Sequence, residues 1–190
     1  MAIELRDVSK RFGNETVLSH VTVRLEDGEC CCLAAPSGSG KTTFLRLLMR
    51  LEKPDEGSLL GLEGKRVSAV FQEDRLLEES SVLSNLRLVT GKLYTAQELA
   101  FAALRLLPEA ALLKKVRECS GGMKRRVALL RALLAPSELL LLDEPFAGLD
   151  EENKRRAVCM IQEYSKGRTV IVAVHSKEEA AHFNARILQL

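Results

Sequence analysis

The 190-residue sequence contains no tryptophan, and aromatic residues make up only 4% of it. It has no apolar run near the roughly 18 residues that a membrane-spanning helix needs, and its first residues lack the pattern of a signal peptide. Its 28 basic and 26 acidic residues leave a net charge of +2, too small for a strong field of either sign. We therefore expect a soluble cytoplasmic protein with no nucleic-acid partner, linked to a membrane only through another protein.

The five cysteines do not form the pattern of a disulfide framework, because their number is odd and three of them are adjacent. They also lack the Cys-x-x-Cys or Cys/His spacing of a metal site. The three adjacent residues lie in an apolar run, which predicts a buried strand. The cysteines are Cys30, Cys31, Cys32, Cys119 and Cys159.

Two kinds of apolar pattern predict an α/β fold. Ile3–Val8 and Thr16–Leu25 alternate, and the turn residues Gly13-Asn14 between them suggest a hairpin. Continuous apolar runs instead predict parallel strands buried on both faces; these are Cys30–Ala34, Val67–Phe71, Leu139–Leu142 and Thr169–Val174, with a last core strand at Arg186–Leu190. The predicted helices are Thr42–Leu51, Ala96–Leu107, Lys124–Leu134, Glu151–Ser165 and Lys177–Phe183.

The region from about residue 73 to residue 120 is rich in leucine and helical in pattern, without a strand signal. Because it separates one core strand from the next, we expect an inserted helical subdomain. The prediction is one domain over residues 1–190, in which 1–72 and 121–190 form the core.

Each of the four continuous apolar runs leads into polar residues suited to chemistry. They are the glycine-rich segment after Ala34, Gln72, the pair Asp143-Glu144, and His175. In open α/β sheets, ligands bind beyond the carboxyl ends of the strands. The sequence therefore predicts one site at one edge of the sheet.

The glycine-rich segment has the residues of a phosphate-binding loop, with Ala35 in the place of the usual first glycine. Gly38 and Gly40 allow backbone N–H groups to turn inward around an anion. The helix that follows adds its positive end, Lys41 can neutralise the β- and γ-phosphates, and the Thr42 hydroxyl can bind Mg²⁺. We expect nucleotide binding to survive the alanine if that residue keeps a negative φ. The candidate loop residues are Pro36, Ser37, Gly38, Ser39, Gly40, Lys41, Thr42 and Thr43.

The carboxylates of Asp143 and Glu144 are predicted to do different work. Adjacent residues on an extended backbone point to opposite sides, so Asp143 could orient the Mg²⁺ shell while Glu144 polarises an attacking water. The alternative is an acidic pair that merely ends a strand.

A second glycine pair, Gly121-Gly122, follows Ser120 and precedes an amphipathic helix. Ser120 is a plausible N-cap, and the glycines permit a close approach of the backbone to an anion. Simple helix capping is the alternative.

Together these segments resemble the ABC ATPase superfamily over nearly the whole chain and in the family's order. Cys119 and Met123 replace the usual leucine and glutamine of the signature, from which we expect altered strength rather than loss of function. The matching segments are Ala35–Thr43 (Walker A), Gln72 (Q-loop), Cys119–Met123 (signature), Leu139–Glu144 (Walker B), Ala147–Asp150 (D-loop) and His175 (switch histidine).

The resemblance implies an α/β P-loop NTPase core with a mostly parallel sheet, an N-terminal antiparallel β subdomain and an inserted helical subdomain. It implies ATP and Mg²⁺ as cofactors, with Thr42, Gln72 and Asp143 at the metal and Phe12 against adenine unless Phe12 is simply core. Glu144 would be the base, His175 would lie near the γ-phosphate and Gln72 would sense the nucleotide. Ser120, Gly121, Gly122 and Asp150 would complete the site of a second subunit in a head-to-tail homodimer, or heterodimer with a related ATPase.

The family resemblance also implies a transmembrane permease partner and a place at the inner face of the cell membrane. The partner's surface would include Arg75–Leu88, whose apolar residues could equally be the core of the helical lobe; they are Leu76, Leu77, Val82, Leu83 and Leu86.

Two other functions are alternatives. One is an ABC ATPase acting on nucleic acid or the translation machinery, for which the basic run Lys124–Arg126 is the only hint and for which long insertions or a second cassette are missing. The other is a regulatory module with little turnover, against which Glu144 and His175 argue. The transported substrate and the direction of transport are not encoded in these motifs.

Overall fold

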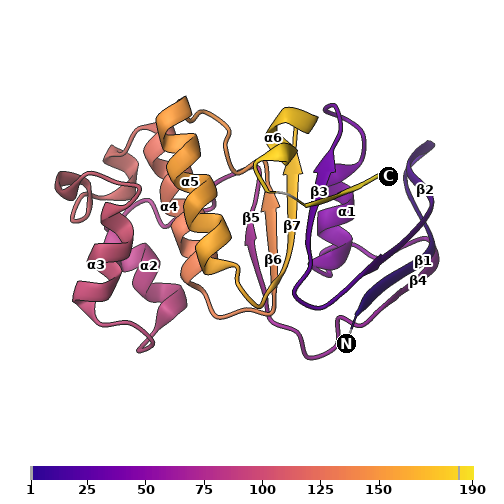
Figure 1. Cartoon of the computed structure of the whole chain (residues 1–190), viewed down its shortest axis with the longest axis horizontal. Helices are drawn as coiled ribbons and strands as arrows, with labels where there is room; N and C mark the ends of the chain where they lie inside the picture. The colour runs from indigo at the N-terminus through magenta and orange to yellow at the C-terminus, as the bar shows by residue number, and fades with distance from the viewer. Residues whose placement is uncertain (1, 184) are drawn as a thin grey trace.

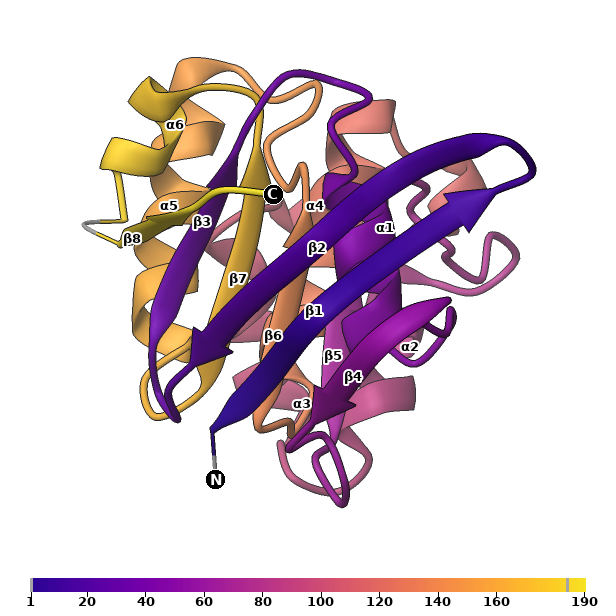
Figure 2. The same ribbon diagram turned by 90° about the vertical axis from the view of Figure 1, so that its right-hand side faces the viewer.

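The computed structural model describes residues 2–183 and 185–190, and it contains two β-sheets and a set of helices (Figures 1 and 2). The first sheet is antiparallel, in the order β2-β1-β4. Strands β1 (Ile3–Phe12) and β2 (Glu15–Leu25) form the predicted hairpin, and both are longer than predicted. Strand β4 (Glu56–Leu60) pairs with β1 and had no signal in the sequence.

The second sheet is parallel and confirms the predicted α/β core. Its order is β5-β6-β7-β3-β8, and all four neighbouring pairs are parallel. The carboxyl ends of its strands therefore meet at one edge. The strands are β3 (Cys30–Ala34), β5 (Val67–Val70), β6 (Leu139–Asp143), β7 (Thr169–Val174) and β8 (Arg186–Leu188).

The parallel strands are apolar throughout because both of their faces are covered. Alternate residues such as Leu141 and Ile171 pack with the buried face of helix α1 (Lys41–Leu48) and with the antiparallel sheet. Their neighbours, such as Leu140 and Val172, belong to the cluster on the helical side. Helix α1 thus lies between the two sheets, as Figure 2 shows.

The helical side contains α4 (Gly121–Leu134) and α5 (Glu151–Tyr164), with the short α6 (Lys177–Ala181) beyond β7. Further out lie α2 (Val82–Thr90) and α3 (Ala96–Leu104), at the left of Figure 1, together with 3-10 turns at Glu109–Ala111 and Val116–Glu118. Between residues 73 and 120, all described, no strand forms and Ser81 and Lys115 make one isolated bridge. The division of the chain into core and helical subdomain stays a prediction.

Several predicted boundaries were wrong by a few residues. The helix expected over Thr42–Leu51 ends at Leu48, since Arg50 takes a φ of 58°. The helix expected from Lys124 begins at Gly121, because Ser120 caps it. Other differences are the shorter carboxyl ends of β5, β8, α3, α5 and α6, the end of β6 at Asp143 and the start of α1 at Lys41.

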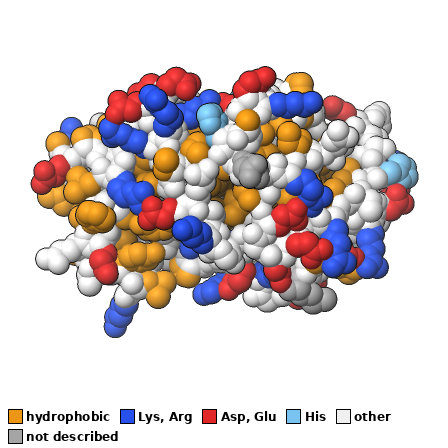
Figure 3. Space-filling model, in the orientation of Figure 1, with side chains coloured by type: hydrophobic (Ala, Val, Ile, Leu, Met, Phe, Trp, Pro, Cys, Tyr) orange, Lys and Arg blue, Asp and Glu red, His pale blue; other side chains and the backbone are white. Residues whose placement is uncertain are grey.

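All five cysteines are free, and the three adjacent ones lie on strand β3, where Cys31 and Cys32 are buried as predicted. Burial raises the pKa of the Cys31 and Cys32 thiols to about 12. Within the described ranges, no helix combines the length and apolar character that crossing a membrane requires. Hydrophobic side chains gather over the helical lobe, while charges of both signs mix at the opposite end (Figure 3).

Candidate nucleotide-binding site

The phosphate-loop segment connects the end of β3 to the start of α1 and curls around a small cavity. Gly38 and Gly40 have φ values of 83° and 88°, which L side chains rarely adopt. Ala35 is not among the residues with positive φ, so the missing first glycine creates no backbone strain. The cavity has a volume of about 210 Å³ and is lined by Val17, Ser37, Gly38, Gly40, Lys41, Thr42, Thr43, Gln72 and Glu144.

Lys41 lies buried at the first position of α1 and is bonded to its own loop. Its ammonium donates to the carbonyl oxygens of Ala35 and Pro36. The Pro36 carbonyl also accepts from Ser39 N–H at 3.4 Å, and the buried Ser39 hydroxyl has no hydrogen-bond partner. A buried cation held by neutral carbonyls next to an unpaired hydroxyl favours the entry of an anion.

The Thr42 hydroxyl donates to Asp143 Oδ2 at 2.8 Å and so joins α1 to the end of β6 across 101 positions of sequence. Burial raises the pKa of Asp143, partly offset by the Thr42 hydrogen bond. The second oxygen, Oδ1, is buried and has no hydrogen-bond partner. A desolvated carboxylate oxygen beside a hydroxyl is a ready ligand for a hard cation.

Glu144 comes directly after Asp143, but the predicted reason for the direction of its side chain was wrong. Its φ is 49°, so the backbone turns there instead of continuing as an extended strand with opposed side chains. Glu144 Oε2 lies 3.0 Å from His175 Nε2, and His175 N–H donates to Glu179 Oε2 at 3.2 Å. The carboxylate is largely buried while the imidazole is half exposed, so the pair stands at the mouth of the site.

The structure brings together most of the residues predicted to form the chain's own part of the nucleotide site, as distinct from those predicted to serve a second subunit. Gln72 is exposed after β5 and lines both the loop cavity and an adjoining pocket that contains Asp143. Phe12 does not line the loop cavity; it is 46% exposed at the end of β1, with Lys10 Nζ 5.2 Å from its ring centroid. Its predicted contact with adenine stays a prediction.

The residues predicted to serve a second subunit do not line this cavity. Ser120 caps α4, accepting from Met123 N–H at 3.3 Å. A Cβ at Gly122 would lie 3.1 Å from the Gly148 carbonyl, so this glycine also allows close packing of the 147–150 segment. Asp150 caps α5, and its hydrogen bond from Asn153 N–H lowers the pKa of its carboxyl.

The basic residues at the start of α4 make contacts within the chain. Lys124 pairs with Glu78 at 2.8 Å, Arg126 donates to Leu106 O at 2.6 Å, and Arg125 is buried. Sequence reasoning missed the burial of Arg125 and the place of Val17 at the cavity. Helical spacing offered a signal for the first, because Arg125 lies four residues before the buried Leu129.

A parallel α/β sheet with a phosphate loop, an acidic strand end and a histidine at one edge defines a P-loop nucleotide-binding protein. Comparison with known proteins narrows this class. Residues 18–147 match the ABC transporter family, and the chain belongs to that family. It is accordingly an ATP-binding protein and an ATPase of the kind that serves ABC transporters.

Individual relatives and solved structures agree. The chain is 37% identical over 190 residues to an aliphatic sulfonates import ATP-binding protein of Shouchella clausii, covering 98% of this chain and 76% of the relative. It is 36% identical to a Nod factor export ATP-binding protein I of Burkholderia lata, covering 97% and 66%. A solved dimeric ATP-binding cassette in a post-hydrolysis state with ADP and Pi superposes with a TM-score of 0.82 at 26% identity, covering 95% of this chain and 90% of that chain.

Proposed function

We propose that this chain hydrolyses ATP in a head-to-tail dimer and thereby powers transport through a separate transmembrane partner. The observation that carries the proposal is the meeting, at one edge of the parallel sheet, of the phosphate loop with the Thr42–Asp143 and Glu144–His175 pairs. The two relatives named above act in import and in export, so the proposal concerns energy supply and names no cargo.

In this proposal the phosphate loop binds the β- and γ-phosphates by exchange of hydrogen bonds. Lys41 transfers its donors from the Ala35 and Pro36 carbonyls to phosphate oxygens, and the N–H groups at the start of α1 face the same anion. The Ser39 hydroxyl, unpaired in the structure, gains an acceptor. These contacts bind and orient the nucleotide without supplying the base.

The residues present suit a Mg²⁺ ion that is bound together with the nucleotide. Mg²⁺ is usually held by one or two protein groups plus substrate phosphates, and no cluster of three acidic, histidine or cysteine residues occurs in the part of the chain that the structure describes. Thr42, Gln72 and Asp143, with its unpaired Oδ1, would hold the ion. Its contribution would be neutralisation of phosphate charge.

Glu144 and His175 carry the hydrolytic step. The Glu144 carboxylate lines the cavity and can accept a proton from the attacking water. The main-chain N–H of His175 donates to Glu179, its Nε2 lies 3.0 Å from Glu144 Oε2, and the ring can turn to the γ-phosphate as that group enters.

The dimer supplies what one chain lacks. Ser120, Gly121 and Gly122 begin a helix whose free N–H groups suit an anion, yet they do not line the chain's own cavity. A two-fold arrangement would place them on the partner's γ-phosphate, with Asp150 nearby. The dimeric state of the solved cassette supports this arrangement.

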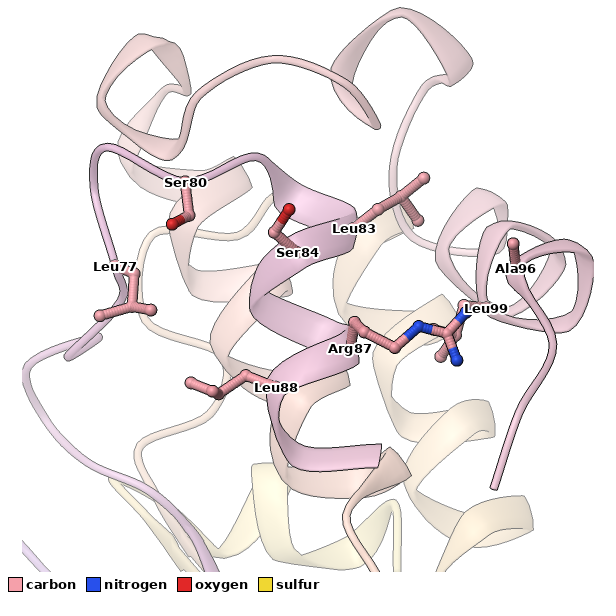
Figure 4. Close-up of a pocket in the computed structure, with 8 residues that line it drawn as sticks. All are labelled: Leu77, Ser80, Leu83, Ser84, Arg87, Leu88, Ala96 and Leu99. Carbon is pink, nitrogen blue, oxygen red and sulfur yellow. The ribbon is translucent and has the colours of Figure 1, made fainter. Parts of the chain in front are cut away.

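A groove in the helical lobe suits the transmembrane partner, which would place the chain at the inner face of the membrane. The lobe groove has a volume of about 530 Å³ and is lined by Leu77, Ser80, Leu83, Ser84, Arg87, Leu88, Ala96 and Leu99 (Figure 4). Leu77 and Leu88 are 49% and 62% exposed. Two of the five apolar candidates, Val82 and Leu86, are fully buried and so take the alternative place in the lobe core.

The catalytic proposal is tested by ATP hydrolysis of the purified chain beside Glu144→Gln. Loss of the base should lower the rate by about 10²–10⁴-fold while a fluorescent ATP analogue still binds. Glu63→Gln, at an exposed turn, is the control and should behave as wild type. Equal rates for wild type and Glu144→Gln would remove the catalytic assignment.

The partner proposal is tested by co-purification of this chain with the transmembrane permease subunits of its own source organism. Leu88→Asp should abolish co-purification by placing a charge in the lobe groove. Leu113→Asp, at a residue that is 81% exposed and outside the groove, should not. Equal recovery of both variants would contradict the proposed docking surface.

A further inference from the structure

Arg125 lies one turn into α4, and its buried guanidinium joins two segments that both end at the nucleotide site. Nη1 donates to Phe71 O at 2.5 Å, Gln72 O at 3.4 Å and Asp74 Oδ1 at 3.2 Å. Nη2 donates to Asp143 O at 2.5 Å and Glu144 O at 2.6 Å. One prong of the fork thus serves each segment.

The Arg125 guanidinium lies just beyond the point where the segments after β5 and β6 stop pairing in the sheet. Strands β5 and β6 pair as far as Val70 and Leu142. Gln72 and Glu144 come two residues later, where no β5–β6 ladder holds them in register. Guanidinium-to-carbonyl bonds replace the missing ladder bonds, and bonds from a charged donor are about twice as strong as neutral ones.

The main chain of Glu144 is unusual and is fixed on both sides. Its φ of 49° is rare for a residue other than glycine. Its N–H donates to Ala173 O at 3.0 Å, and its carbonyl accepts from Ala147 N–H at 3.1 Å as well as from Arg125. Such conformations persist when the surroundings over-determine them. This backbone turn directs the carboxylate toward His175.

We propose that Arg125 is a positioning residue for ATP hydrolysis, which holds Glu144 and Gln72 in a fixed relation through their main chains. The inference rests on the proposed function, in which Glu144 is the base. An arginine is needed because its planar fork can serve two acceptors that diverge, whereas a lysine offers one point of donation. Since Ser120 caps α4, the same side chain connects the signature segment to the part of the site that contains Glu144.

The test compares Arg125→Gln and Arg125→Lys with wild type in steady-state hydrolysis and in binding of a fluorescent ATP analogue. We expect kcat of Arg125→Gln to fall about 10- to 100-fold, as small misplacements of reacting groups do, with the Kd for nucleotide changed less than about threefold because the phosphate loop is untouched. Arg125→Lys should recover part of the kcat.

Arg168→Gln is the matched control for stability. Arg168 is a partly buried arginine that donates to Leu133 O at 3.0 Å, just before β7 begins and so at the opposite edge of the sheet. This variant should lower Tm, by less than Arg125→Gln because it removes a single hydrogen bond, and leave kcat unchanged.

Three outcomes overturn the inference: a wild-type kcat in Arg125→Gln, an equal loss of kcat in Arg168→Gln, or a rise in Kd that matches the fall in kcat. If Arg125→Gln does not fold, Arg125→Lys decides, and an unchanged kcat there overturns it. Failure of the proposed function is distinct, since it would show as wild-type hydrolysis by Glu144→Gln.

Discussion

Alanine substitutions at Gly38 and Gly40 separate backbone strain from steric crowding in the phosphate loop. Both glycines have a φ near +85°, at 83° and 88°. A Cβ at Gly38 would meet nothing within 4 Å. A Cβ at Gly40 would lie 2.8 Å from Leu18 Cδ2 and 2.9 Å from the Val17 carbonyl, both on β2. The carbonyl is main chain, so relief requires β2 or the loop to move.

The expected losses in the free energy of unfolding follow from these contacts. A positive φ costs an L residue about 1–2 kcal/mol, and the stiffer unfolded chain returns about 0.4–1 kcal/mol. Gly38→Ala should therefore cost about 1 kcal/mol. Gly40→Ala adds overpacking worth about 1–3 kcal/mol, for a total of about 2–4 kcal/mol.

Urea unfolding of the nucleotide-free chain, followed by far-UV circular dichroism because the chain lacks tryptophan, measures both losses. Gly13→Ala is the control, since Gly13 has a φ of 59°, open space for a Cβ and a place in the β1–β2 turn. It should cost about as much as Gly38→Ala and leave ATP binding intact. The reasoning is refuted if Gly38→Ala and Gly40→Ala lose equal stability, or if Gly38→Ala loses more.

Three further predictions concern other parts of the molecule. Burial raises the pKa of Asp143 above its ordinary 3.8, so the folded chain keeps that proton to higher pH than the unfolded chain does, and the free energy of unfolding falls as pH rises from about 3.8 through the folded pKa. Asp143→Asn should therefore raise the Tm of the chain without nucleotide at pH 7 while abolishing hydrolysis. A lower Tm would contradict this. Asn85 is fully buried and makes three hydrogen bonds to the 77–81 main chain, two of them to Leu77; Asn85→Ala should cost about 2–4 kcal/mol in urea unfolding, and a loss under about 1 kcal/mol would be inconsistent with that role. Ser120→Ala and Ser81→Ala each remove an N-cap worth about 1 kcal/mol, but only Ser120→Ala should slow hydrolysis, and equal rates would argue against a role for Ser120 at the partner's nucleotide.

The buried core could be predicted because its cause is local in the sequence. The runs at Cys30–Ala34 and Thr169–Val174 match β3 and β7 residue for residue, since strands covered on both faces must be apolar throughout. Strand β4 could not be predicted, because two of its five residues are glutamate and glycine and none is fully buried. Its glycine, Gly57, is required by a distant contact: a Cβ there would lie 2.3 Å from Asp7 O.

The candidate site divides in the same way. The site residues come directly after the apolar runs, so the sequence predicts which residues they are. It does not predict the backbone geometry at Glu144, because the turn with a φ of 49° is stabilised by the distant residues Ala173 and Arg125. The Arg125 guanidinium donates to carbonyls 18 and 19 positions away, and such bonds leave no sequence pattern at the accepting residues. The basic run around Arg125 was a hint of nucleic-acid binding in the sequence, and only the tertiary structure shows that the charge of Arg125 is buried.

Several polar groups around the phosphate loop are held in unfavourable arrangements at once. Asp143 is desolvated with one oxygen unpaired, the Ser39 hydroxyl is unpaired, and Lys41 is bonded to neutral carbonyls. Each group can make better contacts when phosphate and a cation bind, so the favourable free energy of binding includes the pairing that these groups lack in the folded chain alone. At the same nucleotide concentration, ATP with Mg²⁺ should therefore raise the Tm more than ATP alone, because the cation can pair with Asp143 Oδ1 and so lowers the Kd.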